Sequence, residues 1–396
     1  MNICGIVCEY NPFHNGHQYH IDEVRKHADA IVCVMSGNFV QRGEPAILRK
    51  HLRAQAAVLS GADLVVELPT PWATASAERF AQGAIYLYST IPGATHLSFG
   101  CESNDLTALS RTAEILESVD FSDRLKESLK FGVSFATARM NSVLEIDQNC
   151  GKILQYPNNI LAVEYIKALN LISPNIVPIP ILRRFSSHDS DVITEDFASA
   201  SAIRTLIKEQ KNANFARFLP HFSEYSNEFE NGFAPAQIEN AERAILAVLK
   251  HLDADDYLAY PDVSEGLHQR IKTAVSTSGG FLEAVEKIKS KRYAHARIRR
   301  ILLSMFLGIT RDILEQSPPY LRVLALNDTG RSILGQEFTI PVITKPASAK
   351  GLTGFAKQVF DLECKATELY SLFMPNPATH INEFNTSPIY VPGTHQ

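Results

Sequence analysis

The stretch that decides the fold is ICGIVCEYNPFHNGHQYH, residues 3–20. Its apolar start, Ile3 to Cys8, predicts a buried β-strand, and Gly16 to His27 predicts a helix. The turn between them contains an Asn-Pro pair and two histidines, His14 and His17, on either side of a glycine. A strand, a turn and a helix in this order are typical of the opening unit of a parallel α/β sheet.

The same alternation continues through the first half of the chain. Strands are expected over Ala30 to Met35, Leu64 to Leu68, His96 to Phe99 and Ile176 to Leu182, and helices over Arg49 to Ser60, Ala75 to Leu87, Asn158 to Leu169 and Ala200 to Lys208. Continuous apolar runs indicate strands covered on both faces, so the pattern predicts a doubly wound parallel sheet. Ligands bind such sheets beyond the carboxyl ends of the strands, where strand order reverses. The turn after Cys8 is therefore expected at a ligand site.

From about Gln210 onward the pattern becomes mainly helical. Helices are expected over Ala236 to Leu252, Ser264 to Thr277, Gly280 to Lys289 and Ala294 to Gly308. We therefore predict an α/β domain over residues 1–215 and a mainly helical domain over residues 216–396. Apolar pieces between Tyr320 and Lys350 allow part of the second domain to pack back on the first. Residues 382–396 are expected to form a loosely held tail.

Composition narrows the class of protein. The chain has 396 residues, of which 45% are hydrophobic and 20% charged, and a net charge of -5, so an RNA contact requires a local basic patch. Its six cysteines form no CxxC pair, as is usual for reduced cytosolic proteins. Neither a signal peptide nor a run of about 20 apolar residues is recognisable. We expect a cytoplasmic protein with no membrane contact.

The two histidines have a chemical use at this position. If the helix begins near Asn15 or Gly16, both imidazoles point across its first turn, where free N–H groups and the helix dipole attract a phosphate. Gly16 allows a nucleotide to come close. Imidazoles beside an α-phosphate donate hydrogen bonds to oxygens that gain charge as pyrophosphate leaves. Such a site needs no side-chain nucleophile.

Two other interpretations of this motif stay open. An HxGH string alone is also typical of surface histidines at a helix start. His14, His17 and His20 share one helix face, as zinc ligands would, but a carboxylate or thiolate partner nearby is missing. The position directly after the first strand favours nucleotide binding.

The His-x-Gly-His motif resembles the signature of the HIGH-motif nucleotidyltransferases, which include class I aminoacyl-tRNA synthetases. The fuller string EYNPFHNGHQYH is similar to one family among them, the bacterial tRNA(Met) cytidine acetate ligases. The similarity spans nearly the whole chain. It covers SGNFVQRGEPAI (36–47), ADLVVELP (62–69), LSFGCE (97–102), YPNNILAVEYIKAL (156–169) and KRYAHARIRRILL (291–303).

The resemblance implies a HIGH-type nucleotidyltransferase domain, followed by a helical RNA-binding domain, and a two-step reaction. Acetate attacks the α-phosphate of ATP, giving acetyl-adenylate and pyrophosphate. The wobble cytidine of elongator tRNA(Met) then takes the acetyl group on its exocyclic amine, giving N4-acetylcytidine. ATP is thus the expected substrate, accompanied by Mg²⁺, with acetate and elongator tRNA(Met) as partners and no obligatory protein partner.

The resemblance also implies the site residues, with His14 and His17 as the catalytic pair. The expected ATP-binding residues are Val7, Cys8, Glu9, Tyr10, Asn11, Pro12, Phe13, His14, Asn15, Gly16, His17, Gln18, Tyr19, His20, Gly100, Asn158 and Arg183. Gly100 ends a strand, and Asn158 and Asn159 stand at a helix start, where capping is favoured for Asn159. Arg183 and Arg184 follow an extended run, from which an arginine reaches a phosphate, although an exposed strand end also fits.

A second signature is the segment Ser199 to Arg204, SASAIR, which resembles the Ser-containing turn of these transferases. Ser201 is expected to cap a helix whose N–H groups, together with Arg204, engage the β- and γ-phosphates of ATP. The alternative is a plain helix N-cap at Ser199 or Ser201.

A dense basic cluster follows in the helical half. The expected RNA-binding residues are Lys291, Arg292, Arg297, Arg299 and Arg300. Aromatic residues interleave with them, as RNA stacking requires, but a solvated helix face is the alternative. A second patch, consisting of Arg42, Arg49, Lys50 and Arg53, is expected to meet the anticodon stem or the nucleotide.

Two competing functions remain at this stage. One is adenylyl transfer to a small phosphorylated metabolite without RNA, against which the long helical part with its basic cluster argues. The other is an RNA-binding module with a degenerate ATP site, against which the intact His14, Gly16, His17, Ser201 and Arg204 argue.

Overall fold

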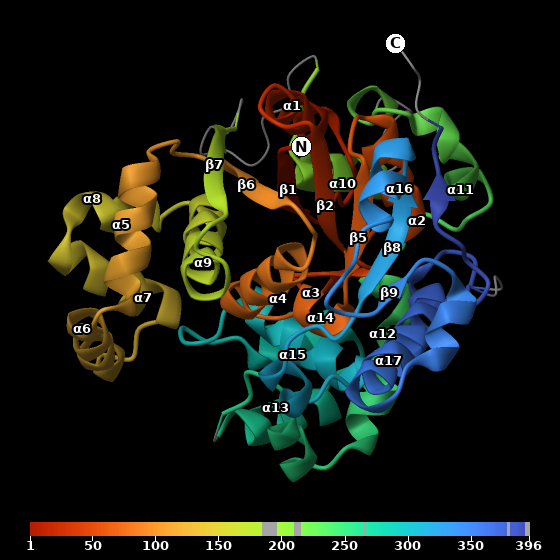
Figure 1. Ribbon diagram of the computed structural model, residues 1–396. Coiled ribbons are helices and arrows are strands. Elements are labelled where there is room, and N and C mark those ends of the chain that lie inside the picture. Colours follow the sequence, from red (N-terminus) through yellow and green to blue (C-terminus); the bar gives the residue numbers. More distant parts are fainter. Residues whose placement is uncertain (184–195, 210–214, 265, 378–380, 393–396) are drawn as a thin grey trace.

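The computed structural model describes residues 1–183, 196–209, 215–264, 266–377 and 381–392. These residues form an eight-stranded sheet with the order β10-β8-β5-β2-β1-β6-β7, in which β9 pairs with β8 (Figure 1). The parallel centre consists of β1 (Ile3–Cys8), β2 (Ala30–Ser36), β5 (Leu64–Leu68), β6 (Ala94–Cys101) and β7 (Val177–Leu182). The predicted α/β fold and all five predicted strands are confirmed.

Helices cover both faces of this sheet, as the apolar strands predict. Alternate residues of β2 point to opposite faces: Val32 and Val34 belong to one core cluster, and Cys33 and Met35 to the other. The first cluster includes α4 (Ala77–Ser89) and α9 (Pro157–Ile172), and the second includes α1 (Asn15–Arg25), α2 (Lys50–Leu59) and α10 (Ala200–Lys208). This two-sided burial is the doubly wound arrangement.

The helical half packs below the sheet in the view of Figure 1. Its main helices are α12 (Ile238–His251), α13 (Leu267–Ser276), α14 (Phe281–Ile288), α15 (His295–Leu307) and α17 (Gly354–Tyr370). Shorter helices of this half are α11 (Ser226–Glu230) and α16 (Asp328–Leu334), and the short α3 (Thr70–Ala73) follows β5 in the first half of the chain. The four helices predicted here are confirmed, and they share one apolar cluster with the first half of the chain.

The chain then returns to the sheet. Strand β8 (Leu321–Leu326) pairs antiparallel with β5, and β9 (Val342–Ile343) and β10 (Ile389–Tyr390) pair with β8. The expectation of a loosely held tail is therefore wrong for the described part of residues 382–396. The sequence does not reveal β10, because this strand is short and forms only by pairing with β8, which lies far away in the sequence.

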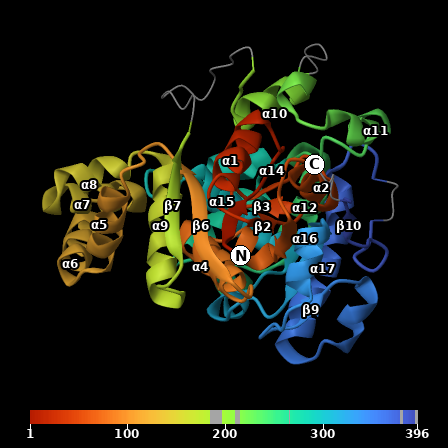
Figure 2. The same cartoon turned by 45° about the horizontal axis from the view of Figure 1, so that its top comes forward.

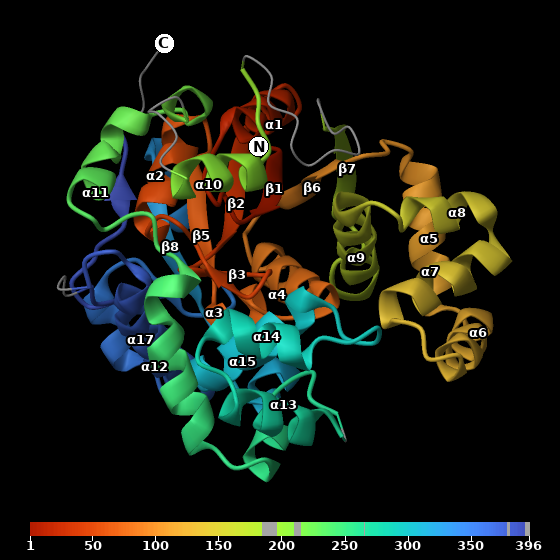
Figure 3. The same ribbon diagram turned by 180° about the vertical axis from the view of Figure 1, so that it is seen from behind.

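Four further helices were not foreseen from the sequence. They are α5 (Leu106–Glu117), α6 (Val119–Lys130), α7 (Phe135–Ile146) and α8 (Gln148–Ile153), inserted between β6 and α9. Figures 1 and 3 show them projecting from the β7 edge of the sheet. Among the described residues, no helix is both long enough and apolar enough to span a membrane.

Candidate active site

The candidate site lies where strand order reverses. Strand β1 stands between β2, which follows it in the chain, and β6, so β1 and β6 flank the switch point. Pairing between them runs only to Ile6 and Ser98, although β1 continues to Cys8 and β6 to Cys101. The strands therefore separate at their carboxyl ends, where the HIGH turn begins. Figure 2 shows α1 and α10 together at this part of the sheet.

The two histidines build the start of α1 themselves. His14 is the N-cap residue: its Nδ1 accepts a hydrogen bond from the Gly16 N–H at 3.0 Å, while His17 Nδ1 accepts one from the His14 N–H at 3.3 Å. This reciprocal arrangement is a capping box made of imidazoles. A Cβ at Gly16 would stand only 2.8 Å from His14 Cε1, so glycine is needed beneath the ring.

The accepting Nδ1 atoms fix the tautomers. A neutral imidazole with one accepting nitrogen carries its proton on the other, so Nε2–H of both rings is a donor. Burial, followed by Arg183 and Arg204, lowers the pKa of His14 to about 3, and burial and His14 lower the pKa of His17 well below its usual value. Among the described residues, the buried His14 Nε2 has no hydrogen-bond partner. The site thus offers a buried N–H donor, shielded from water, at a helix N-terminus, and such a donor suits an anion.

The opposite wall comes from β6, β7 and α9. His20 Nε2 lies 2.9 Å from Ser98 Oγ, which ties α1 to β6. Arg183 follows β7 directly, and its Nη1 donates a hydrogen bond to Asn158 Oδ1 at 3.5 Å. Burial, followed by the charge of Arg183, lowers the pKa of His20 to about 4. A Cβ at Gly100 would stand 3.3 Å from Arg183 Cγ, so this glycine makes room for the arginine. Arg184 lies outside the described residues.

Glu102 is a site residue that the sequence reasoning missed. Its carboxylate accepts hydrogen bonds from Asn158 Nδ2 at 2.5 Å and from the backbone N–H of Asn159 at 2.9 Å, and thereby caps α9. The expected capping by Asn159 is wrong: its Oδ1 accepts from the backbone N–H groups of Glu102 and Ser103. A glutamate directly after a strand at the ligand edge was the available signal.

The second signature reaches the same place. Ser199, rather than Ser201, caps α10 by accepting from the Ala202 N–H at 3.1 Å, so the expected cap at Ser201 is wrong. Ser201 Oγ instead accepts from Arg204 Nη2 at 3.1 Å and Arg42 Nη1 at 3.5 Å. Arg204 also donates to the carbonyl of Asn11 at 2.8 Å, which places it against the HIGH turn.

Much of the Val7 to His20 segment is structural. Cys8, Tyr10, Pro12 and Phe13 are buried, whereas Val7 and Tyr19 are partly buried. Asn11 Oδ1 accepts from the Ile47 N–H, Asn15 Nδ2 donates to the carbonyls of Asp196 and Arg217, and Gln18 Nε2 donates to Asp22 and to the Ser60 carbonyl. Glu9 Oε1 accepts from the Gln41 N–H at 2.8 Å, and burial raises its pKa. These contacts hold the turn that carries the histidines.

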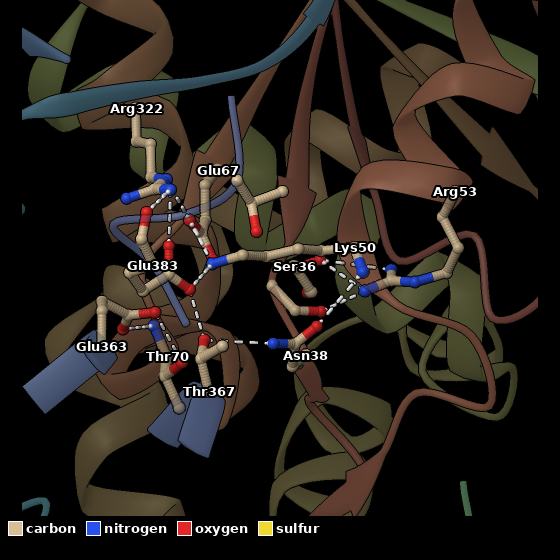
Figure 4. A network of polar contacts seen from close by, with 12 residues as sticks. Ser36, Asn38, Lys50, Arg53, Glu67, Thr70, Arg322, Glu363, Thr367 and Glu383 are labelled. Carbon is tan, nitrogen blue, oxygen red and sulfur yellow. Dashed lines mark hydrogen bonds and ion pairs between the residues drawn. The ribbon is translucent and has the colours of Figure 1, made fainter. Parts of the chain in front are cut away.

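Two members of the second basic patch, Lys50 and Arg53, are buried and do not form an RNA surface. Figure 4 shows Lys50 and Arg53 inside a buried polar network. Lys50 Nζ lies 2.7 Å from Glu67 and 2.5 Å from Glu383. Arg53 donates to the carbonyls of Glu9, Ser36, Gly37 and Leu48, so it clamps the ends of β1 and β2.

The other members of that patch differ. Arg49 is paired with Glu228 at 2.5 Å, whereas Arg42 faces Ser201 at the site. The expectation is wrong for Arg49, Lys50 and Arg53, because partners from distant segments occupy cations that the sequence presents as a cluster, whereas for Arg42 a contact with the nucleotide stays a prediction.

The arginines of α15 also have partners. Arg299 forms an ion pair with Glu44 of β4 (Glu44–Pro45), which pairs with β3 (Phe39–Val40). Arg300 lies 3.9 Å from Asp262 and borders a cavity of about 320 Å³, and Arg297 stacks on Tyr293 at 5.2 Å. By contrast, Lys291 and Arg292 are exposed.

A model of the HIGH nucleotidyl transferase family matches residues 1–385. The tRNA(Met) cytidine acetate ligase of Acetivibrio thermocellus is 38% identical over 400 residues, covering 96% of each chain. That of Clostridium novyi is 38% identical and covers 99% of this chain and 100% of its own.

Two solved structures are similar along the whole chain. Thermotoga maritima TmcAL is 32% identical, with a TM-score of 0.92 without ligand and 0.91 bound with alpha-thio ATP, and covers 99% of this chain and 100% of its own. The fold, the switch-point position of the HIGH turn and this similarity agree. The chain belongs to the HIGH nucleotidyl transferase family and, within it, to the family of the tRNA(Met) cytidine acetate ligases.

Proposed function

We propose that the chain is an ATP-dependent tRNA acetate ligase. It activates acetate as acetyl-adenylate with release of pyrophosphate, and then acetylates the wobble cytidine of elongator tRNA(Met) to N4-acetylcytidine. Full-length similarity to curated ligases of this name supports the proposal, as does the alpha-thio ATP complex of the Thermotoga maritima relative.

The observation that carries the proposal is the pair of Nε2–H donors at the start of α1. The α-phosphate of ATP lies over this helix end, where His14 and His17 donate to oxygens that gain charge as pyrophosphate leaves. Arg183 and Arg204 both depress the pKa of His14, so their charges stand near the same space and stabilise the polyphosphate. Gly100 and Asn158 line the nucleoside side of this space.

Mg²⁺ would accompany ATP, because this ion is usually bound through the phosphates of a nucleotide. It would supply charge neutralisation at the leaving pyrophosphate, while Arg183, Arg204 and the two imidazoles of this chain bind and orient the phosphates. Among the described residues, no group of three or more His, Cys, Asp and Glu side chains is placed to hold an ion.

The test is acetate-dependent pyrophosphate release from ATP, with and without tRNA, followed by nucleoside analysis of the tRNA. N4-acetylcytidine should appear only when ATP, acetate, tRNA and protein are all present. Pyrophosphate release that depends on neither acetate nor tRNA would move the activity to adenylylation of a small phosphorylated metabolite. Tight tRNA binding without ATP consumption would indicate an RNA-binding module.

A further inference from the structure

Two turns from distant parts of the chain contact each other outside the candidate site. One is the turn between α6 and α7, and the other is the tight turn before α15 that is closed by the pairing of Ser290 with Tyr293. A Cβ at Gly132 in the first turn would stand 3.8 Å from Arg292 Nη2 in the second. Figures 1 and 3 show the loop before α15 reaching toward α7.

The first turn exposes large apolar rings. Phe131 is 85% exposed and Phe135 is 52% exposed. Two phenylalanines on one turn leave apolar area in water without any benefit to folding, and a patch of this kind is typical of an interaction surface. An aromatic face is also a platform on which any nucleobase stacks.

The second turn adds unpaired positive charge. Lys291 and Arg292 stand exposed at its tip, and among the described residues neither has an acidic partner. The cations of α6 differ, because Arg124, Lys126 and Lys130 each pair with a carboxylate on their own helix. The local excess charge is therefore positive and lies beside the exposed rings, a combination that suits single-stranded RNA more than a protein partner.

Helix α15 connects the basic turn to the candidate site. Helix α15 begins at His295, directly after the basic turn, and one turn later its Arg299 pairs with Glu44. The helix rises about 6 Å over these residues. Burial lowers the pKa of Arg204, and the charge of Glu44 partly offsets this shift. Glu44 therefore lies near Arg204, one of the arginines of the proposed ATP site. RNA that lies on the two turns is thus held by an element that also contacts the proposed phosphate site.

We propose that Phe131, Phe135, Lys291 and Arg292, the two-turn surface, hold the anticodon-loop nucleotides that flank the acceptor cytidine. The rings stack on unpaired bases, and the cations contact phosphates. The proposal rests on the proposed function and adds to it the element that positions the RNA. It also gives a role to the α5 to α8 helices.

The experiment measures binding of fluorescently labelled tRNA(Met) over a range of salt concentrations. Phe131→Ala and Phe135→Ala should each weaken binding roughly 5- to 150-fold, the equivalent of one lost base stack. Lys291→Ala with Arg292→Ala should flatten the slope of log K against log salt by about 1.4, because two phosphate contacts are lost. Adenylate formation without tRNA checks that each variant is folded.

Matched controls come from the same helices. Val119→Ala removes an exposed apolar side chain at the other end of α6, and Lys126→Ala removes an exposed cation outside the two-turn surface. Both should bind tRNA as the unaltered protein does. If the four surface substitutions behave like these controls, the proposal is wrong.

Two further outcomes are distinguishable. If the phenylalanine substitutions alter the sedimentation of the protein but not its affinity for tRNA, the surface is a contact between copies of the chain and the proposal is overturned. If the unaltered protein neither binds nor acetylates tRNA, the proposed function fails and this proposal fails with it. Normal acetylation by the unaltered protein together with unaffected variants refutes the surface alone.

Discussion

The imidazole rings of His14 and His17 lie face to face, with centroids 3.7 Å apart and planes inclined by 22°. Two imidazolium ions at this distance would repel each other strongly, so the stacked pair is neutral. Each Nδ1 is occupied by a backbone N–H of the same turn. The pair is therefore preorganised to donate through Nε2 before any substrate arrives.

Loss of either ring should mainly affect the transition state. His14→Ala and His17→Ala are each expected to cost about 2.7–4 kcal/mol in the barrier, the range measured for one lost charge-stabilising donor. The measurement is the rate of acetate-dependent pyrophosphate release at saturating ATP. His27→Ala, at an exposed position just beyond the end of α1, is the control. Near-normal release by the His14 or His17 variant would remove the assignment.

Arg53 should be needed for the shape of the site. In Arg53→Met, the buried carbonyls of Ser36, Gly37 and Leu48 lose a donor, at about 1–3 kcal/mol for each group left unsatisfied, and the Glu9 carbonyl loses one as well. We expect a lower free energy of unfolding in urea and a higher KM for ATP. The control is Arg111→Met, an exposed arginine whose side chain is 58% accessible. Unchanged KM and stability would contradict a clamping role.

The buried charge network should be sensitive to removal of one partner. Glu383→Ala leaves Lys50 and Arg322 in the core with one carboxylate less, which should destabilise the protein by about 3–5 kcal/mol. Asp361→Ala, which breaks the exposed pair with Lys357, should cost only about 0.2–1 kcal/mol. Denaturant unfolding of both variants makes the comparison, and equal losses would count against the network.

The same network predicts a pH dependence. Lys50 and Arg322 balance Glu67 and Glu383 when Glu363 is neutral, and burial, followed by Glu67, raises the pKa of Glu363 from 4.5 to about 8. The folded state then holds a proton that the unfolded state releases. This group's contribution to stability is complete below pH 4.5 and declines as pH rises toward 8, by up to about 1.4 kcal/mol per pH unit.

Glu363→Gln keeps the neutral form at every pH. The variant should therefore gain stability relative to the unaltered protein as pH rises through this window. Urea unfolding across the window measures the difference, with the exposed Glu368→Gln as the control. A parallel pH dependence in the unaltered protein and Glu363→Gln would show that Glu363 is ionised in the fold.

The sequence predicts the sheet well because its strands are apolar on both faces, and the HIGH turn because its position after β1 is local. It does not predict that Lys50 and Arg53 are buried, because their burial depends on Glu383 and on backbone carbonyls from other segments. The capping role of Glu102 was missed for the same reason, since Glu102 caps α9, which is distant in the sequence. The α5 to α8 helices were missed because the alternation of strands and helices predicts one helix between β6 and β7, a role that α9 already fills.

The pairing of Lys50 with Glu383 joins residues 333 positions apart. During synthesis, Lys50 leaves the ribosome long before its second carboxylate exists. The buried polar network behind the first strands is therefore completed only after residue 383 has been added. A fragment that stops short of Glu383 would contain every residue proposed to bind ATP, but Lys50 and Arg322 would share the single carboxylate of Glu67 as long as Glu363 is neutral.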